Sequence, residues 1–255
     1  TLLVIGNSPA TLLPFIVGTL EEGFNLSKQS VGSVVSTELI AMAISAIFFG
    51  SKISKINIRI SALAGCSAIV IAYFLCSLVE NIELLRAIRG FSGIGSGLLI
   101  ACGHNVLSTS NKPERSYAAF MLATSLLGAS FVWIAGIAAE EGGYKLIFIT
   151  FGFIFLLMTP LLFFVRKESV LAKELVENTS ITLNSPIVVL LILGLLFFAL
   201  PAGGMWAFNE RLGVEIGLLQ SNVGKILSFS LLVGLFAPVL VWFVGDRFGR
   251  KKPIL

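Results

Sequence analysis

Long runs of apolar residues constrain this chain more than any other feature of its sequence. A run of about 18 or more apolar residues with few charges is long enough to cross a bilayer as a helix. The runs here do not alternate as the strands of a membrane barrel do, so we predict an all-α polytopic membrane protein. We expect eight membrane-spanning helices, at Leu2–Leu20, Val31–Gly50, Ile60–Val79, Leu84–Leu107, Tyr117–Ala139, Tyr144–Val165, Pro186–Phe208 and Ser221–Gly245.

The composition supports a bilayer as the partner that surrounds the chain. Hydrophobic residues make up 56% of the sequence and charged residues 13%, whereas soluble domains have about 45–50% and about 25%. A soluble fold would expose much of this apolar surface to water. The sequence Glu21-Glu22-Gly23 after the first run does not resemble a signal-peptidase site, so we expect that run to be retained.

The charges of the links predict the orientation. Every second link carries most of the basic residues: Lys52, Lys55, Arg59, Lys112, Arg115, Arg166, Lys167, Lys173, Arg247, Arg250, Lys251 and Lys252. The other links are acidic, with Glu21, Glu22, Glu80, Glu83, Glu140, Glu141, Glu210 and Glu215. Because basic links stay in the cytoplasm, we expect a cytoplasmic N-terminus, in a bacterial inner membrane. The basic residues are scattered over links, which argues against a nucleic-acid partner.

The sequence also contains a repeat. A shift of 192 residues aligns Leu26, Val31, Gly32, Ser36 and Leu39 with Leu218, Val223, Gly224, Ser228 and Leu231. This offset corresponds to six spans. We therefore predict a complete N-terminal six-helix bundle in residues 1–166, a cytoplasmic inter-bundle linker in residues 167–185 and the first two helices of a C-terminal bundle in residues 186–255. About four further helices are expected after Leu255.

Two prolines occupy matching places in the repeat. Pro9 in the first span aligns with Pro201 in the seventh. A proline inside a helix removes a backbone hydrogen bond, and interrupted helices at matching places are typical of substrate sites in transporters. We predict that Asn7, Pro9, Pro201 and Trp206 line a substrate pathway. The alternative is that the prolines only bend the helices for packing.

Three ionisable residues within the spans are further candidates for the substrate or proton pathway. Arg89 and Glu38 are expected at similar depths, where they could neutralise each other, and protonation of Glu38 would break the pair. His104 can titrate near neutral pH. The alternatives are a snorkelling Arg89, a purely structural Glu38 and a His104 that is simply polar at a helix end.

Two motifs resemble those of a known family. The link Gly245-Asp246-Arg247-Phe248-Gly249-Arg250-Lys251-Lys252 resembles the signature loop of the major facilitator superfamily, and the first-half copy has Ser54 in place of the aspartate. The second motif runs from Leu85 through Arg89 and Ser92 to three glycines, and it resembles the fourth-helix pattern of that superfamily. Its Gly93 and Gly97 are expected to let helices pack closely.

This resemblance implies a major-facilitator-like transporter. We expect secondary active transport of a small organic solute by alternating access, coupled to protons through Arg89 and Glu38. In this reading the loop residues Asp246, Arg247, Gly249, Arg250 and Lys251 form a conformational gate. The alternatives are a uniporter, a drug-efflux antiporter, or a receptor or scaffold that does not transport. The fifth span lacks the glycine pairs of drug antiporters, and no span shows the continuous polar lining of a channel.

We expect no enzyme activity and no cofactor. The sequence contains neither a nucleotide-binding loop nor a nucleophile paired with a base. The three cysteines, Cys66, Cys76 and Cys102, lack the spacing of metal ligands. We expect the transporter to function as a monomer.

Overall fold

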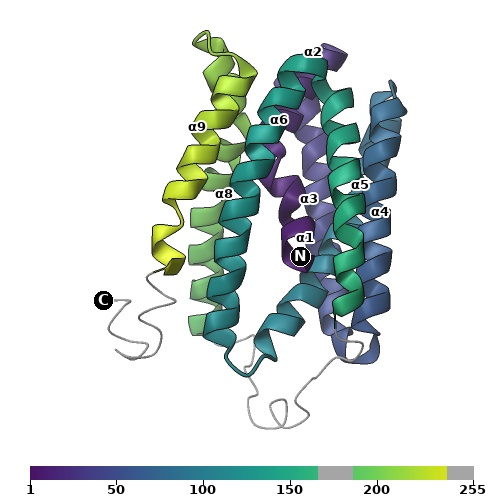
Figure 1. Ribbon diagram of the computed structural model, residues 1–255, viewed down its shortest axis with the longest axis vertical. Coiled ribbons are helices and arrows are strands. Elements are labelled where there is room, and N and C mark those ends of the chain that lie inside the picture. The colour runs from purple at the N-terminus through teal and green to yellow at the C-terminus, as the bar shows by residue number, and fades with distance from the viewer. Residues whose placement is uncertain (166–185, 240–255) are drawn as a thin grey trace.

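The computed structural model describes residues 1–165 and 186–239, and within them it contains helices and no strands. Figure 1 shows the helices side by side along one common direction. The all-α polytopic fold predicted from the sequence is confirmed. The predicted gate residues Asp246, Arg247, Gly249, Arg250 and Lys251 lie outside the described residues, as does the whole predicted linker, residues 167–185.

The helix bounds follow the predicted spans closely. The α-helices are α1 (Leu2–Thr11), α2 (Leu13–Phe24), α3 (Lys28–Ser51), α4 (Ile58–Leu78), α5 (Ile82–Ser108), α6 (Pro113–Met158), α8 (Pro186–Glu215) and α9 (Gln220–Val233), with 3₁₀ turns η1 (Ile53–Lys55) and η2 (Thr159–Phe164). In the described part of the chain, six helices are long and apolar enough to cross a membrane, or seven if α1 and α2 form one bent span.

Short polar side chains fix where several helices begin. Ser27 Oγ accepts a hydrogen bond from Ser30 N at 3.2 Å, and Asn57 Oδ1 accepts one from Ile60 N at 3.1 Å. Asn81 Oδ1 accepts from Glu83 N and Leu84 N. These contacts satisfy amide donors that have no partner within the helix, and so they start α3, α4 and α5.

The first span is bent at Leu12. Helices α1 and α2 meet there at 44°, between Pro9 inside α1 and Pro14 in the first turn of α2. A proline in a helix removes one backbone hydrogen bond and crowds the preceding turn. The sequence therefore places the bend in the middle of the span.

Helix α6 contains two successive spans. It has 46 residues, which corresponds to about 69 Å of helix against a hydrocarbon core of about 30 Å. Gly143 interrupts it with φ 60° and ψ −151°, a conformation that favours glycine. In Figure 1 the chain reverses direction there. The predicted spans Tyr117–Ala139 and Tyr144–Val165 lie on either side of this break.

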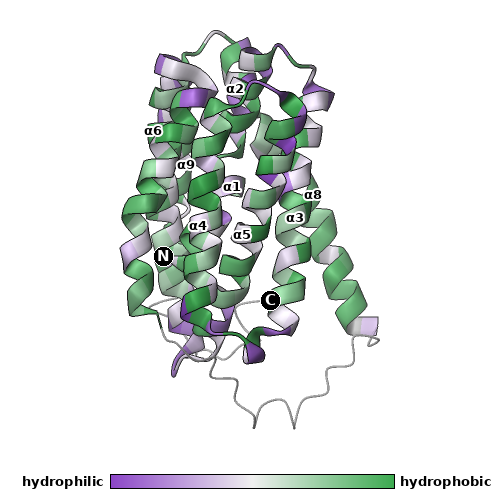
Figure 2. Cartoon of the chain, turned by 90° about the vertical axis from the view of Figure 1, so that its right-hand side faces the viewer, coloured by the Kyte–Doolittle hydropathy of each residue, from purple (hydrophilic) through white to green (hydrophobic). Residues whose placement is uncertain are grey.

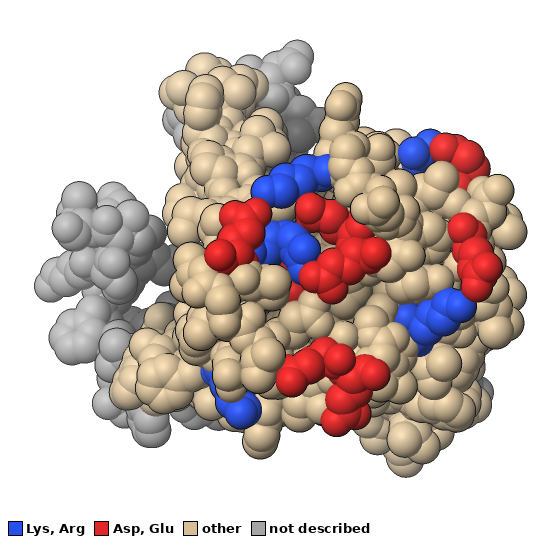
Figure 3. All heavy atoms as spheres, turned by 90° about the horizontal axis from the view of Figure 1, so that it is seen from above, with Lys and Arg blue, Asp and Glu red and all other residues tan. Residues whose placement is uncertain are grey.

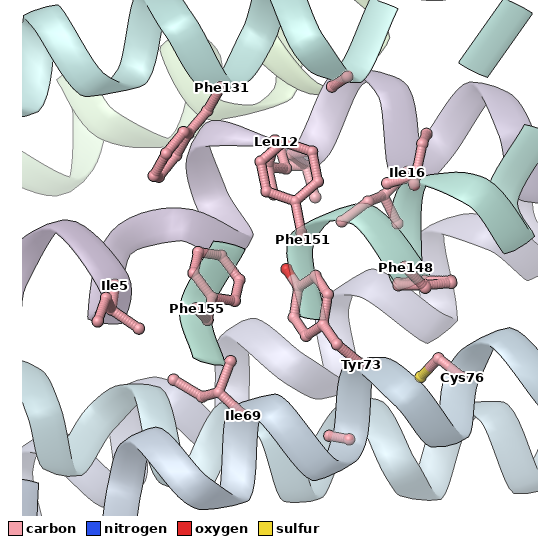
Figure 4. Packing of buried hydrophobic residues seen from close by; sticks show 14 of the residues in the cluster. Ile5, Leu12, Ile16, Ile69, Tyr73, Cys76, Phe131, Phe148, Phe151 and Phe155 are labelled. Atoms are coloured by element: carbon pink, nitrogen blue, oxygen red, sulfur yellow. The ribbon is translucent and has the colours of Figure 1, made fainter. Parts of the chain in front are cut away.

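The core lies where α1 and α2 pack against α4 and the second part of α6 (Figure 4). Tyr73 of α4 makes edge contacts with Phe148 and Phe155, whose ring centroids lie 5.5 Å and 5.2 Å away. Phe131 contacts Phe151 in the same way at 5.5 Å. Such edge-to-face pairs stabilise aromatic packing beyond their buried area. They join the two parts of α6 to the rest of the bundle.

The outside of the bundle is apolar along its middle. Figure 2 shows hydrophilic residues mainly at the two ends and hydrophobic residues between them. Large side chains such as Ile47, Leu78 and Phe164 are exposed. Exposed apolar surface on this scale is favourable in lipid and unfavourable in water.

Candidate functional site

A cavity of about 420 Å³ lies between the early helices, by which we mean α1 to α6, and the last two described helices, α8 and α9. Five helices contribute to it: α1, α5, α6, α8 and α9. Its described lining consists of Asn7, Ala10, Thr11, His104, Phe120, Met121, Thr124, Ser125, Trp206 and Leu231. The cavity thus brings together three of the residues singled out from the sequence, namely Asn7, His104 and Trp206.

Trp206 of α8 hydrogen-bonds to a backbone carbonyl group that the bent first span leaves without a partner. Pro14 has no amide hydrogen, so the carbonyl of Ala10 lacks the donor that a regular helix would give it. The indole Nε1 of Trp206 donates to this carbonyl oxygen at 3.0 Å. A side chain of α8 therefore satisfies a group freed by a proline in the first span, which is one way that membrane helices tolerate breaks.

The two matched prolines have different surroundings. Pro9 is buried, and the Ile5 carbonyl that it frees accepts a hydrogen bond from Ser8 Oγ at 2.6 Å. Pro201 is exposed on α8. Neither proline is part of the described lining of the cavity. Their role in a substrate pathway remains a prediction.

His104 lies among aromatic rings at the edge of the cavity. Its ring is stacked on Tyr117 with centroids 5.9 Å apart, and Phe120 meets it edge-on at 6.3 Å. His104 Nδ1 and the Tyr117 hydroxyl are 3.4 Å apart. Asn7 donates its Nδ2 to the Leu3 carbonyl at 2.7 Å. The cavity edge is therefore ordered by packing on α5 and α6 and by a local bond on α1.

Arg89 and Glu38 form a buried ion pair between α5 and α3. Nη2 of Arg89 donates to Oε2 of Glu38, and both side chains are fully enclosed by protein. The guanidinium also lies over the rings of Tyr73 and Phe148, 5.2 Å and 5.3 Å from their centroids. An arginine in this environment keeps its charge because a carboxylate and two aromatic faces stabilise it.

The ion pair is incompletely hydrogen-bonded. Oε1 of Glu38 and Nε and Nη1 of Arg89 are buried, and none makes a well-aligned hydrogen bond among the described residues, although the hydroxyls of Ser92 and Tyr73 lie beside the pair. Buried polar groups are nearly always paired, so exceptions of this kind call for a structural or functional explanation. Neither Arg89 nor Glu38 belongs to the described lining of the cavity.

The predicted packing glycines hold α5 against α3 beside the ion pair. A Cβ at Gly93 would overlap the carbonyl oxygen of Glu38, and a Cβ at Gly97 would overlap that of Met42. Only glycine permits such a close approach of two helix backbones. The depth of Glu38 relative to Arg89 therefore depends on these glycines.

Glu210 is a second buried carboxylate, which sequence reasoning placed in a polar link. Helix α8 continues to Glu215, and Glu210 is fully buried where α8 meets Gly18 of α2. Nε of Arg211 donates to its Oε2 at 3.0 Å. The apolar run ends near Phe208, so hydropathy alone could not reveal this burial. The repeat offered one signal, because Glu210 aligns with Gly18, 192 residues earlier.

Polar contacts between the early helices and the last two gather at the end with the acidic links. Arg211 of α8 also pairs with Glu22 of α2, and Gln220 Nε2 donates to Glu22 Oε2 at 3.2 Å. Lys28 pairs with Glu215 at 2.9 Å. Figure 3 shows this end, where acidic and basic side chains form small mixed clusters. We call Glu22, Glu210, Arg211 and Gln220 the outer cluster.

At the opposite end α8 is separate from the early helices. Side chains from Leu190 to Leu200 are exposed, whereas Ala207 and Glu210 are buried. Figure 2 shows the lower part of α8 diverging from the other helices. The described contacts between α8 and α2 therefore lie on one side of the cavity.

The predicted repeat relates residues of α2 to residues of α8 that lie near them, and one such pair, Gly18 and Glu210, is in contact. Pro14 and Gly18 of α2 align with Trp206 and Glu210 of α8, because each pair differs by 192 positions. Trp206 bonds the carbonyl freed by Pro14, and Glu210 lies against Gly18. The first span and α8 therefore meet beside the cavity, since Ala10 and Trp206 both belong to its described lining.

In residues 1–165 and 186–239, no three His, Cys, Asp or Glu side chains come together to hold a metal ion. Cys66, Cys76 and Cys102 are buried and unbridged. The described cavity lining presents hydroxyl and amide groups, aromatic rings and the imidazole of His104.

Comparison with known proteins gives a family and two relatives. The model of the Major Facilitator Superfamily matches residues 2–255. A gentisate transporter of Corynebacterium glutamicum is 23% identical over 140 residues, which are 52% of this chain and 32% of that protein. A riboflavin transporter of Clostridioides difficile is 25% identical over 134 residues, which are 51% of this chain and 29% of that protein. Each match spans less than a third of the relative.

Proposed function

This chain belongs to the Major Facilitator Superfamily, and from that membership we propose that it is part of a secondary active transporter for a small organic solute. The observation that carries this proposal is the cavity of about 420 Å³ between the early helices and α8 and α9. Substrate sites in transporters built from repeats lie at the interface between the halves. The two relatives are named for gentisate and riboflavin, which supports an organic solute.

We propose that transport proceeds by alternating access, and that the polar contacts on one side of the cavity close that side. The outer cluster closes the end with the acidic links, which is the periplasmic side if the N-terminus is cytoplasmic, as the basic links predict. Residues 1–166 then move as one unit against the unit that begins at residue 186, and residues 167–185 connect them. The loop from Asp246 to Lys251 would gate the opposite side. We propose a monomer in a bacterial inner membrane as the working form.

We assign proton coupling to Glu38 and Arg89. A proton that binds Glu38 would neutralise the carboxylate of Glu38, and the guanidinium of Arg89 would then lose its ion partner. The incomplete hydrogen bonding of the pair supports this assignment, because a fully satisfied pair would resist protonation more strongly. Intramembrane ionisable pairs are common in proton pathways. Gly93 would transmit the change, since it holds α5 against the backbone of Glu38.

The experiment that tests the function is transport by the full-length protein in liposomes. Radiolabelled solutes report flux, and a pH-sensitive dye inside reports proton movement. Solute entry that depends on the protein, accompanied by proton movement, is the expected result. If the protein binds solutes but no labelled solute crosses in either direction, it is a receptor and not a transporter.

Glu38→Gln separates coupling from transport. The amide cannot exchange a proton, so we expect solute-driven proton movement to fall by at least about tenfold while solute exchange at equal concentrations continues. Glu83→Gln is the matched control, because Glu83 is exposed and its ion partner in the described part of the chain is Arg86 of its own helix. Proton movement in Glu38→Gln equal to that of the unmodified protein would refute the coupling assignment.

Arg211→Gln is expected to open the side closed by the outer cluster. Arg211 bonds the buried Glu210 and also Glu22 across the helices, and hydrogen bonds to charged groups contribute about 1.5–3 kcal/mol each. A cysteine placed at Thr124 in a cysteine-free protein should then react about tenfold faster with an impermeant maleimide added on that side.

The control for this prediction is Lys28→Gln. Lys28 and its partner Glu215 are both more than half exposed, and ion pairs that are exposed to water contribute little to stability. We expect its labelling rate to change by less than about fivefold. Equal rates for the two variants would mean that the outer cluster does not hold this side closed.

A further inference from the structure

Aromatic rings from three helices contribute to the cavity lining. His104 comes from α5, Phe120 from α6 and Trp206 from α8. The rings are held in place before any solute binds: His104 is stacked on Tyr117, and Trp206 is fixed by its bond to the Ala10 carbonyl. Aromatic rings attract one another beyond the area that they bury. Aromatic rings that are already held in place therefore favour contact with a flat ring of a solute.

The polar part of the lining consists of hydroxyl and amide groups. Asn7 and Thr11 lie on α1, and Thr124 and Ser125 lie on α6. Oγ1 of Thr124 is buried without a hydrogen-bond partner in the described part of the chain. A buried hydroxyl left unpaired is unfavourable, and a ligand that bonds it removes that cost. The lining is therefore suited to a solute that carries hydroxyl, carbonyl or amide substituents.

The part of the cavity lining that the structure describes offers no carboxylate to a cation. The described lining contains no Asp, Glu, Lys or Arg, and His104 is its one titratable side chain. The two glutamates that are fully buried in the described part of the chain are already paired, Glu38 with Arg89 and Glu210 with Arg211. A positive charge taken from water without a counter-ion is strongly disfavoured. His104 can instead donate a hydrogen bond to a neutral or anionic substituent.

From this lining we propose that the cavity binds a planar aromatic solute that bears hydrogen-bonding substituents and no positive charge. The proposal rests on the cavity being the transport site. The ring lies between Trp206 and the His104 and Phe120 side, and its substituents bond Thr124 and Asn7. A volume of about 420 Å³ is within the usual range of about 300–1,000 Å³ for sites that enclose small molecules.

The test uses matched probes and measures binding, so it does not depend on flux. Full-length protein in lipid nanodiscs is dialysed to equilibrium with radiolabelled benzamide, benzoate, benzylamine, cyclohexanecarboxamide or cyclohexanecarboxylate. We expect benzamide and benzoate to bind at least about tenfold more tightly than their saturated counterparts, and benzylamine to bind at least about tenfold more weakly than benzamide. Equal affinities within the pairs, no saturable binding of any aromatic probe, or benzylamine binding as tight as benzamide would each overturn the proposal.

Substitutions in the cavity lining test whether the probes bind in this cavity. Trp206→Ala should lower benzamide affinity by about tenfold, and Trp133→Ala should not change it, since Trp133 is an exposed tryptophan of α6 outside the lining. Phe120→Leu keeps apolar bulk without a ring and should lower affinity by about fivefold, which covers the case that Trp206→Ala does not fold. Unchanged affinity in both cavity variants would place the ring elsewhere and overturn the assignment.

The two proposals fail in different ways. Selective binding of benzamide and benzoate with no transport of any solute would refute the transporter and leave the ligand class standing. Transport of saturated solutes, without preference for their aromatic counterparts, would overturn the ligand class and leave the transporter standing.

Discussion

Arg89→Met is expected to lower the free energy of unfolding by about 3–5 kcal/mol. Methionine fills much of the same space, but it leaves the carboxylate of Glu38 buried without its ion partner. Removal of one partner from a buried pair typically costs this much, because the remaining charge loses its compensation. It also removes the cation over the rings of Tyr73 and Phe148. The measurement is unfolding of the full-length protein in mixed micelles, followed by fluorescence.

The double variant Glu38→Gln with Arg89→Met should recover most of that stability. No charge then remains inside the bundle, and well-packed neutral replacements of buried ion pairs are often neutral or stabilising. Transport coupled to protons should remain lost in the double variant. Recovered stability without recovered coupling would show that the pair exists for function. A single variant as stable as the unmodified protein would contradict the buried ion pair itself.

Gly97→Ala is expected to destabilise the protein by about 1–3 kcal/mol, although alanine is the better helix former. The new Cβ would overlap the Met42 carbonyl oxygen, and it would lie 2.6 Å from Ser45 Cβ and 2.7 Å from Ala46 N. Backbone atoms cannot rotate away as a side chain can, so α3 and α5 must separate. That separation would also disturb the ion pair between the same helices. The same unfolding measurement reports the loss.

Gly90→Ala on the same helix is the matched control. Its Cβ would meet Thr37 Cγ2 at 3.4 Å, an ordinary contact with a side chain. We expect stability to be unchanged or to rise by up to about 1 kcal/mol, the helix-propensity gain of alanine over glycine. Equal losses in the two variants would mean that close packing against α3 is not what fixes glycine at position 97.

Much of the architecture is determined by the sequence alone. Runs such as Ile60–Val79 are apolar for the length of a bilayer, and the bilayer selects helices because no other open structure satisfies its own backbone bonds there. The prolines predicted interruption of the first span, and Gly143 lies between two predicted spans in α6. The pairing of Glu38 with Arg89 could be predicted from the sequence, because an unpaired charge within a membrane span is energetically unfavourable.

The candidate site was decided by tertiary structure. Hydropathy ends the seventh span near Phe208, but contact with Gly18 of α2 buries Glu210 just beyond that point. Nothing in the local sequence of α8 reveals that Trp206 bonds the Ala10 carbonyl, since that bond depends on a proline almost two hundred residues away. Local sequence fixes helices because their hydrogen bonds are local, whereas the cavity depends on which faces of distant helices meet, and only packing of the whole bundle settles that.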